Sequence, residues 1–199
     1  MNARHTTVTA AWRQVFVEAG GAVPDRNVER LLRDTHVPVP PQDQRRLDLI
    51  VPNLNVAFGV PLFCDITIIS PVTRIGTARG GTSNAGGALL RRAEIDNNRT
   101  YAPVIRSGLG ALFCLGHEVY GRWHVKCVEL LIQLAREHSR GLPVRLRKGL
   151  FISYVKRWSS LIGVAIQKAV ADNILNSAGV DLSSSMLEVA PSLSGLHLN

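Results

Sequence analysis

The spacing of apolar residues along this chain predicts four helices. Apolar side chains recur with helical period over residues 7–19, 88–101, 119–138 and 158–175, which gives each segment one apolar face. Gly20 and Gly21 end the first of these segments, and Gly141 with Pro143 ends the third.

Other segments have the pattern of β-strands. Residues 46–52 (RLDLIVP) alternate, residues 60–70 (VPLFCDITIIS) are mostly apolar and β-branched, and residues 109–115 (LGALFCL) are again apolar. The second pattern is typical of a central buried strand, which we expect to form a hairpin with the first. Residues 27–34 fit either a short strand or a helical turn. The order of these elements predicts an α/β fold, with a mixed central sheet flanked by helices.

Changes in composition divide the chain into three parts. Residues 1–140 hold the predicted α/β core, which includes a loop rich in Gly, Ser and Thr at 71–87. Residues 141–176 are predicted to form a basic, C-terminal helical extension. From 177 to 199 serine is frequent and the apolar period fades, so we expect a disordered tail.

Composition narrows the classes of protein to which the chain can belong. Its 199 residues, 46% of them hydrophobic, suffice for one packed domain. The formal net charge of +8 favours a phosphate-rich partner, DNA or alternatively RNA. Three cysteines without framework spacing argue against a disulfide-stapled fold, and no apolar run is long enough to span a membrane. We therefore expect an intracellular protein, nuclear or cytoplasmic, that is neither secreted nor membrane-bound.

Two aspartates interrupt the apolar strands and are the main candidates for chemistry. Asp48 lies within residues 46–52 and Asp65 within residues 60–70, and a buried carboxylate is costly unless it is paired or binds a metal. On neighbouring strands the two can converge on a hard cation, Mg²⁺ or Mn²⁺. Such a cation activates water for attack on a phosphodiester. Thr67, two residues after Asp65, is expected on the same face of its strand.

The helix predicted over residues 88–101 offers further site residues. Glu94 is a candidate outer metal ligand or a residue that orients water, and Arg92 and Arg99 are candidates to hold a scissile phosphate. A simpler alternative is that both aspartates are structural and bind a neighbouring arginine or backbone groups.

A second candidate surface is basic. Between residues 136 and 157 the only acidic residue is Glu137, so the segment is strongly positive. We expect it to contact the phosphates of a nucleic acid, although a solvated helix surface has the same composition. The basic residues are Arg136, Arg140, Arg145, Arg147, Lys148, Lys156 and Arg157.

Two pairs of residues, Cys114 with His117 and His124 with Cys127, also have a spacing that fits zinc ligands. Cys114 falls in a predicted strand and Cys127 on an apolar helix, where cysteine is commonly a small buried side chain. We therefore favour packing over zinc for these residues.

Several short runs, in this order, resemble one known family: residues 46–52, 65–71, 93–101 and 112–121. They are similar to the PD-(D/E)xK endonuclease-like domain that follows reverse transcriptase in some non-LTR retrotransposons, and to retroelement-like open reading frames of dinoflagellate algae. The resemblance spans roughly residues 10–175. It implies a restriction-endonuclease-like fold, divalent metal bound by Asp48 and Asp65, and nicking of DNA.

The sequence departs from that family at the catalytic lysine. Its third motif is Asp65-Ile66-Thr67 in place of D/E-x-K, and residues 1–125 contain no lysine. Arginine stabilises charge but stays protonated, so it cannot replace a lysine in proton transfer. The sequence therefore predicts a Mg²⁺-dependent DNA endonuclease or, alternatively, a catalytically inactive nucleic-acid-binding module of the same fold. A protein-interaction domain with structural aspartates is a third possibility.

Overall fold

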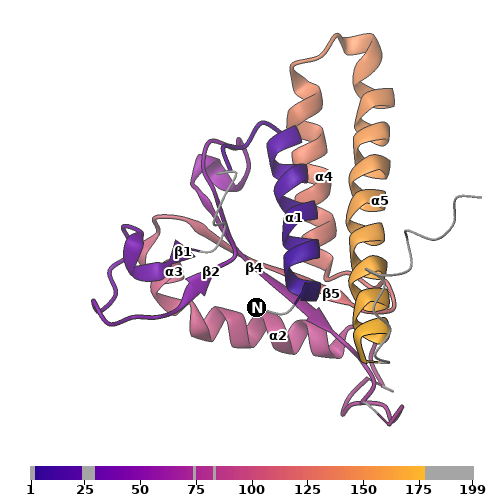
Figure 1. Cartoon of the computed structure of the whole chain (residues 1–199). Helices are drawn as coiled ribbons and strands as arrows, with labels where there is room; N and C mark the ends of the chain where they lie inside the picture. The colour runs from indigo at the N-terminus through magenta and orange to yellow at the C-terminus, as the bar shows by residue number, and fades with distance from the viewer. Residues whose placement is uncertain (1–2, 24–29, 74, 83, 178–199) are drawn as a thin grey trace, which may run out of the picture.

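The computed structural model describes residues 3–23, 30–73, 75–82 and 84–177, and in them five α-helices surround a small mixed sheet (Figure 1). The helices are α1 (Ala3–Glu18), α2 (Ala88–Thr100), α3 (Ala102–Ser107), α4 (Val125–Arg140) and α5 (Val144–Ser177). The strands are β1 (Arg30–Leu31), β2 (Arg46–Leu47), β3 (Leu49–Val51), β4 (Leu62–Ile69) and β5 (Ala111–Glu118). The predicted mixed α/β architecture is thus confirmed.

The main sheet has the strand order β3-β4-β5, with β4 at its centre. β3 and β4 are antiparallel, and Leu49 lies opposite Cys64. β4 and β5 are parallel, with Asp65 opposite Cys114. The chain crosses from β4 to β5 through α2 and α3, since parallel neighbours need a crossover connection. The prediction that residues 60–70 form a central strand is confirmed.

The single strand expected over residues 46–52 is divided at Asp48. The residues before it form β2, which pairs with β1 in a separate two-stranded sheet, and those after it form β3. The N–H of Asp48 still donates to the carbonyl of Cys64, at 3.1 Å. Beyond Cys64, no described strand pairs with β4 on this side, although β4 continues to Ile69. We call this stretch of β4 its open edge.

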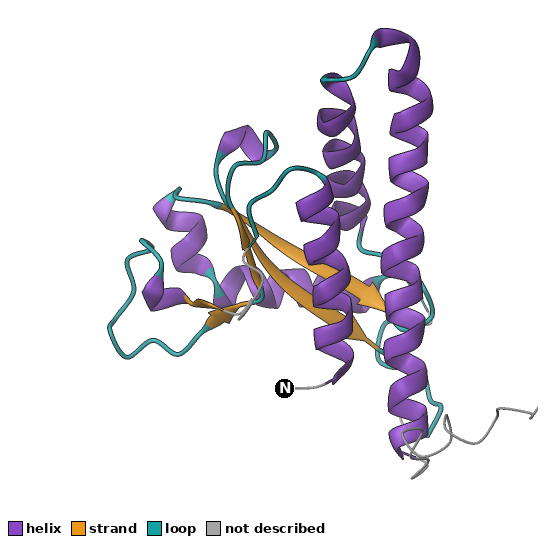
Figure 2. Cartoon of the chain, turned by 45° about the horizontal axis from the view of Figure 1, so that its top comes forward, coloured by secondary structure: helices purple, strands orange, loops and turns teal. Residues whose placement is uncertain are grey.

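Helices cover both faces of the sheet. α1 and α4 lie against one face and α5 packs on both of them, whereas α2 crosses the other face (Figures 1 and 2). Cys64 and Ile66 of β4 are buried on the first face, in one core with Trp12 of α1 and Trp158 of α5. This core contains most of the fully buried large side chains among the described residues.

Side chains of β4 with odd numbers point to the face covered by α2. Phe63 packs there with Tyr101 in a second, smaller core. Because strand residues alternate between faces, Asp65 and Thr67 lie on this face as well. The fold therefore places Asp65 beneath α2, beside the open edge of β4.

Two of the helix predictions were wrong in their boundaries. The helix expected from residue 119 begins at Val125, because β5 continues to Glu118 and a turn follows at Gly121, where φ is 89°. The helix expected from residue 158 begins at Val144, because the basic residues before it form its first turns. The short helix α3 has no counterpart in the sequence pattern.

α5 belongs to the main core. Trp158, Ile162 and Ile166 are fully buried there, so the segment predicted as a basic extension also carries core residues. Most of the tail predicted for residues 177–199 lies outside the described residues. Within the described part of the chain, no helix combines the length and the apolar character that crossing a bilayer requires.

Candidate functional site

Asp48 lies between β2 and β3, and its side chain turns toward the open edge of β4. Its Oδ2 accepts a hydrogen bond from the backbone N–H of Ile66, at 2.5 Å. The same oxygen is 3.0 Å from Nε2 of His5, near the start of α1. Asp48 is only 6% exposed. Its side chain accepts from a β4 N–H that pairs with no described strand, and it also joins α1 to the sheet.

Asp65 lies on β4 beneath α2, and three side chains bind its carboxylate. Asn97 of α2 donates from Nδ2 to Oδ2, at 2.7 Å. The Tyr101 hydroxyl donates to Oδ1 at 3.1 Å, and the Thr67 hydroxyl donates to Oδ2 at 3.2 Å. Burial and then the negative charge of Asp65 raise the pKa of Tyr101, which keeps the phenol protonated as a donor.

The two aspartates interact electrostatically. Burial is the main cause that raises the pKa of Asp65, while the hydrogen bond from Asn97 opposes it. The negative charge of Asp48 raises the same pKa further. The Tyr101 hydroxyl also contacts the carbonyl oxygen of Arg46, two residues before Asp48. Tyr101 therefore touches Asp65 and the chain that leads to Asp48. A like charge nearby favours the protonated form of a carboxyl group or a bound cation.

The donor set fits a cation that keeps part of its water. A carboxylate has about four lone pairs, and Asp48 uses Oδ2 for both of its contacts within the described structure. Mg²⁺ prefers hard oxygen ligands and usually takes only one or two carboxylates from a protein. Among the described residues, no group of three or more His, Cys, Asp and Glu side chains is arranged to hold a metal ion. Asp48 and Asp65 would therefore have to be supplemented by water and substrate oxygens to complete the shell of such an ion.

Glu94 lies one turn before Asn97 on α2 and contacts two basic side chains. Its Oε2 is 3.3 Å from Nε2 of His124, and its Oε1 contacts Nζ of Lys126, at the start of α4. Cys114 of β5 connects this group to Asp65: burial chiefly raises the pKa of its thiol, and the charges of Asp65 and Glu94 raise it further. The fold thus brings a lysine to the face of α2 that also carries Asn97.

The two arginines predicted as phosphate ligands lie elsewhere. Arg92 and Arg99 are exposed on α2, seven residues apart and so on one face of the helix. Arg99 lies two residues after Asn97, about 200° further around the helix axis, so this face points away from Asp65. Arg99 is 3.7 Å from Asp96, a loose surface pair.

The predicted nucleic-acid-binding residues occupy the end of α4 and the first half of α5, whose hairpin projects beyond α1 (Figure 1). Arg140 pairs with Glu137 at 2.9 Å, and Arg157 pairs with Glu18 of α1 at 2.7 Å. All seven are exposed: Arg136, Arg140, Arg145, Arg147, Lys148, Lys156 and Arg157.

The cysteine and histidine pairs do not converge. Cys114 faces α2, whereas His117 lies in the opposite core, where its Nε2 accepts a hydrogen bond from Trp12 Nε1 at 2.9 Å. The Cys127 thiol contacts the carbonyl of Cys114, at 3.7 Å. These residues pack the sheet against the helices, as the sequence favoured.

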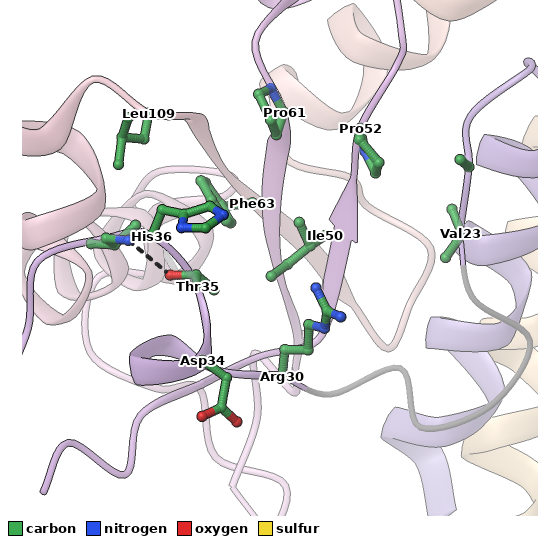
Figure 3. Close-up of a pocket in the computed structure, with 12 residues that line it drawn as sticks. Val23, Arg30, Asp34, Thr35, His36, Ile50, Pro52, Pro61, Phe63 and Leu109 are labelled. Carbon is green, nitrogen blue, oxygen red and sulfur yellow. Dashed lines mark hydrogen bonds between the residues drawn. The ribbon is translucent and has the colours of Figure 1, made fainter. Parts of the chain in front are cut away.

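A separate cavity of about 360 Å³ lies beside the beginning of β4 (Figure 3). Ile50 and Phe63 form part of its apolar wall, and Arg30 and His36 also line it (Figure 3). Neither aspartate nor any side chain that binds one of them lines this cavity. The candidate chemistry therefore lies outside it.

Sequence reasoning missed several partners of the aspartates. His5 is 43 residues from Asp48, and nothing in its local pattern marks it. Lys126 reaches Glu94 only because α4 begins beside α2. Asn97 and Tyr101 had a usable signal, since residues four apart share a helix face.

Comparison with known proteins finds no family model, curated protein or solved structure that matches this chain significantly. Any function assigned to the chain therefore depends on its own residues and their geometry.

Proposed function

We propose that this chain is a metal-dependent endonuclease with a restriction-endonuclease-like core, of the kind that retroelements use to nick DNA. The observation that carries the proposal is that Asp48 binds the open edge of β4 next to Asp65 and that its charge raises the pKa of Asp65. The succession of hairpin, crossover helix and parallel strand agrees with the expected core. The order of the sequence motifs along these elements supports the same assignment.

In this proposal Asp48 and Asp65 hold Mg²⁺ or Mn²⁺. An ion held there would supply Lewis-acid chemistry, namely activation of water and stabilisation of charge on the phosphate. His5 keeps Asp48 oriented from α1, and Asn97 and Tyr101 keep Asp65 oriented from α2. Such second contacts fix the direction of a metal ligand and tune its basicity.

Glu94 and Lys126 complete the proposed centre. Glu94 orients water or binds as an outer ligand, and its contacts with His124 and Lys126 fix its position. Lys126 supplies positive charge without occupying the strand position that Thr67 holds.

Nicking of supercoiled plasmid tests the proposal. Purified protein with Mg²⁺ or Mn²⁺ is expected to produce nicked circles, and Asp48→Asn and Asp65→Asn are each expected to abolish them. Glu129→Gln, at an exposed carboxylate of α4, is the matched control. Circular dichroism checks that the variants fold. Nicking that persists in a folded Asp65→Asn variant contradicts the proposal.

The exposed basic hairpin favours a second candidate, a nucleic-acid-binding module that does not cleave. This alternative also accounts for Thr67 in place of lysine. It predicts DNA binding that weakens steeply with salt, because released counterions drive such binding. Wild-type protein that binds in this way and never nicks supports the alternative and overturns cleavage.

A further inference from the structure

A second cavity, of about 450 Å³, lies where the chain before β2 meets the end of α2 and α3. Three arginines line it from separate segments: Arg45 before β2, Arg99 in the last turn of α2 and Arg106 in α3. Prolines form much of the remaining wall: Pro38, Pro40 and Pro103. The hollow thus combines rigid apolar walls with guanidinium groups.

Arg45 is held in a fixed orientation. Its Nε lies 3.0 Å from one carboxylate oxygen of Asp43, and its Nη2 also contacts that carboxylate. Its Nη1 donates to the carbonyl of Thr100. The hydrogen bond from Arg45 is the main cause that lowers the pKa of Asp43, so the pair stays ionised. Since a guanidinium has five N–H groups, two remain for a ligand.

The other two arginines keep most of their donors. Arg99 is 3.7 Å from Asp96, which is too long for a hydrogen bond. Arg106 is exposed, and no hydrogen bond or ion pair holds its guanidinium within the described structure. Three guanidinium groups face two carboxylates around this cavity, which leaves a positive balance.

We propose that the cavity between Arg45, Arg99 and Arg106 binds a backbone phosphate of a nucleic acid. Planar guanidinium groups match phosphate oxygens, and the proline walls suit the attached sugar. The chain connects the cavity to the aspartate site, because Thr100 binds Arg45 and its neighbour Tyr101 binds Asp65. The choice of nucleic acid over a free phosphate rests on the proposed function. The cavity then holds the same nucleic acid away from the bond that is cleaved at the aspartate site.

Fluorescence anisotropy with a labelled DNA duplex, without divalent cations, tests this site. Arg99→Gln and Arg106→Gln are each expected to weaken binding about tenfold, and to lower the slope of log K against log salt by about one. The control is Lys168→Gln, which removes one exposed charge of α5 far along the chain from the cavity. It is expected to change affinity by less than about twofold. Thermal denaturation checks that each variant is folded.

Two outcomes overturn the inference. One is that Arg99→Gln and Arg106→Gln weaken DNA binding no more than Lys168→Gln does. The other concerns inorganic phosphate, which would raise the melting temperature of wild type but not of Arg106→Gln. If the two proteins then bind DNA with the same affinity, the site takes free phosphate and not nucleic acid. The plasmid assay separates the two proposals. If DNA binding depends on the arginines but the protein does not nick, the phosphate site stands and the endonuclease proposal is overturned. If the protein nicks but its DNA binding does not depend on the arginines, the endonuclease proposal stands and the phosphate site is overturned.

Discussion

His117 shows how a single buried side chain can set the acid limit of the fold. Its Nε2 accepts a hydrogen bond from Trp12, so its proton lies on Nδ1, which has no partner among the described residues. Burial lowers the pKa of His117 to about 3. The core therefore tolerates only the neutral ring.

This burial predicts a loss of stability in mild acid. The contribution of His117 is complete above its unfolded pKa of 6.5 and is lost as the pH falls toward about 3. The expected loss is on the order of 4 kcal/mol. The side chain of His117→Gln cannot become charged. In urea titrations at several pH values, the free energy of unfolding of this variant is therefore expected to change less between these two pH values than that of wild type. An unchanged slope between pH 6.5 and 5 in this variant contradicts the prediction.

Asp65 predicts a different dependence, on metal. Its pKa is raised, so its contribution to stability is greatest below its unfolded value of 3.8 and decreases as the pH rises. Asp65→Asn is therefore expected to be at least as stable as wild type at neutral pH without metal.

Added Mg²⁺ is expected to reverse that order. At a concentration a hundred times its Kd, Mg²⁺ stabilises a protein that binds it only when folded by about 2.7 kcal/mol. Calorimetry is expected to show a higher Tm with Mg²⁺ for wild type and no shift for Asp65→Asn. Equal shifts in both proteins place the ion elsewhere.

Residue patterns identified the two aspartates but not their surroundings. A carboxylate inside an apolar strand stands out because burial is costly, and Asp48 and Asp65 do so. His5 lies in a polar stretch and Lys126 on an amphipathic helix, and only tertiary packing brings them to Asp48 and Glu94. Partners of this kind have no local signature.

At the scale of elements, Glu18 joins the two helices that lie farthest apart in sequence. Both of its oxygens bind Arg157 of α5, at 2.7 and 3.0 Å, and Oε2 also accepts from Trp158 Nε1 at 2.8 Å. These contacts lower the pKa of Glu18 to about 2, with the hydrogen bond from Arg157 as the largest cause.

Glu18→Gln is expected to destabilise the protein by about 1 kcal/mol at neutral pH, because the pair is partly exposed and solvent screens it. A lowered pKa gives stability that is present above about 4.5 and lost as the pH falls toward 2. Wild type and variant should therefore converge in strong acid. Chemical denaturation measures the free energy of unfolding of wild type and Glu18→Gln, with Glu129→Gln as control. The same difference between the two proteins at neutral pH and in strong acid contradicts the prediction.

Element boundaries were predictable where periodicity was strong and failed at junctions. The apolar, β-branched run of β4 was clear in the sequence. The division of β2 from β3 at Asp48 was not, because the hydrogen bond from the Ile66 N–H to the Asp48 side chain has no sequence pattern. The helix predicted from Val119 begins later because these residues follow β5 directly and turn at Gly121 before α4 starts. The length of α5 was underestimated because its first turns are rich in basic residues and have no clear apolar period.

For the whole molecule, the distribution of charge predicts how DNA affinity responds to salt. Arg145, Lys148 and Lys156 are exposed on α5 without an ion pair among the described residues. A triple change to glutamine is expected to weaken duplex binding and to lower the salt slope by at most about 2.7, since each phosphate contact contributes about 0.9. Anisotropy titrations at several salt concentrations measure this. An unchanged slope removes the hairpin from the interface.

The pairing of α1 with α5 also governs how a growing polypeptide can mature on the ribosome. α1 is translated before α5, and Trp158 follows its partner Glu18 by 140 residues. Until α5 leaves the exit tunnel, Glu18 lacks its partners Arg157 and Trp158, and the face of α1 that packs on α5 is not yet covered by it. The side chains that bind Asp65 are all synthesised by the time the chain reaches Tyr101, so the surroundings of this aspartate can assemble before the α1–α5 contact closes.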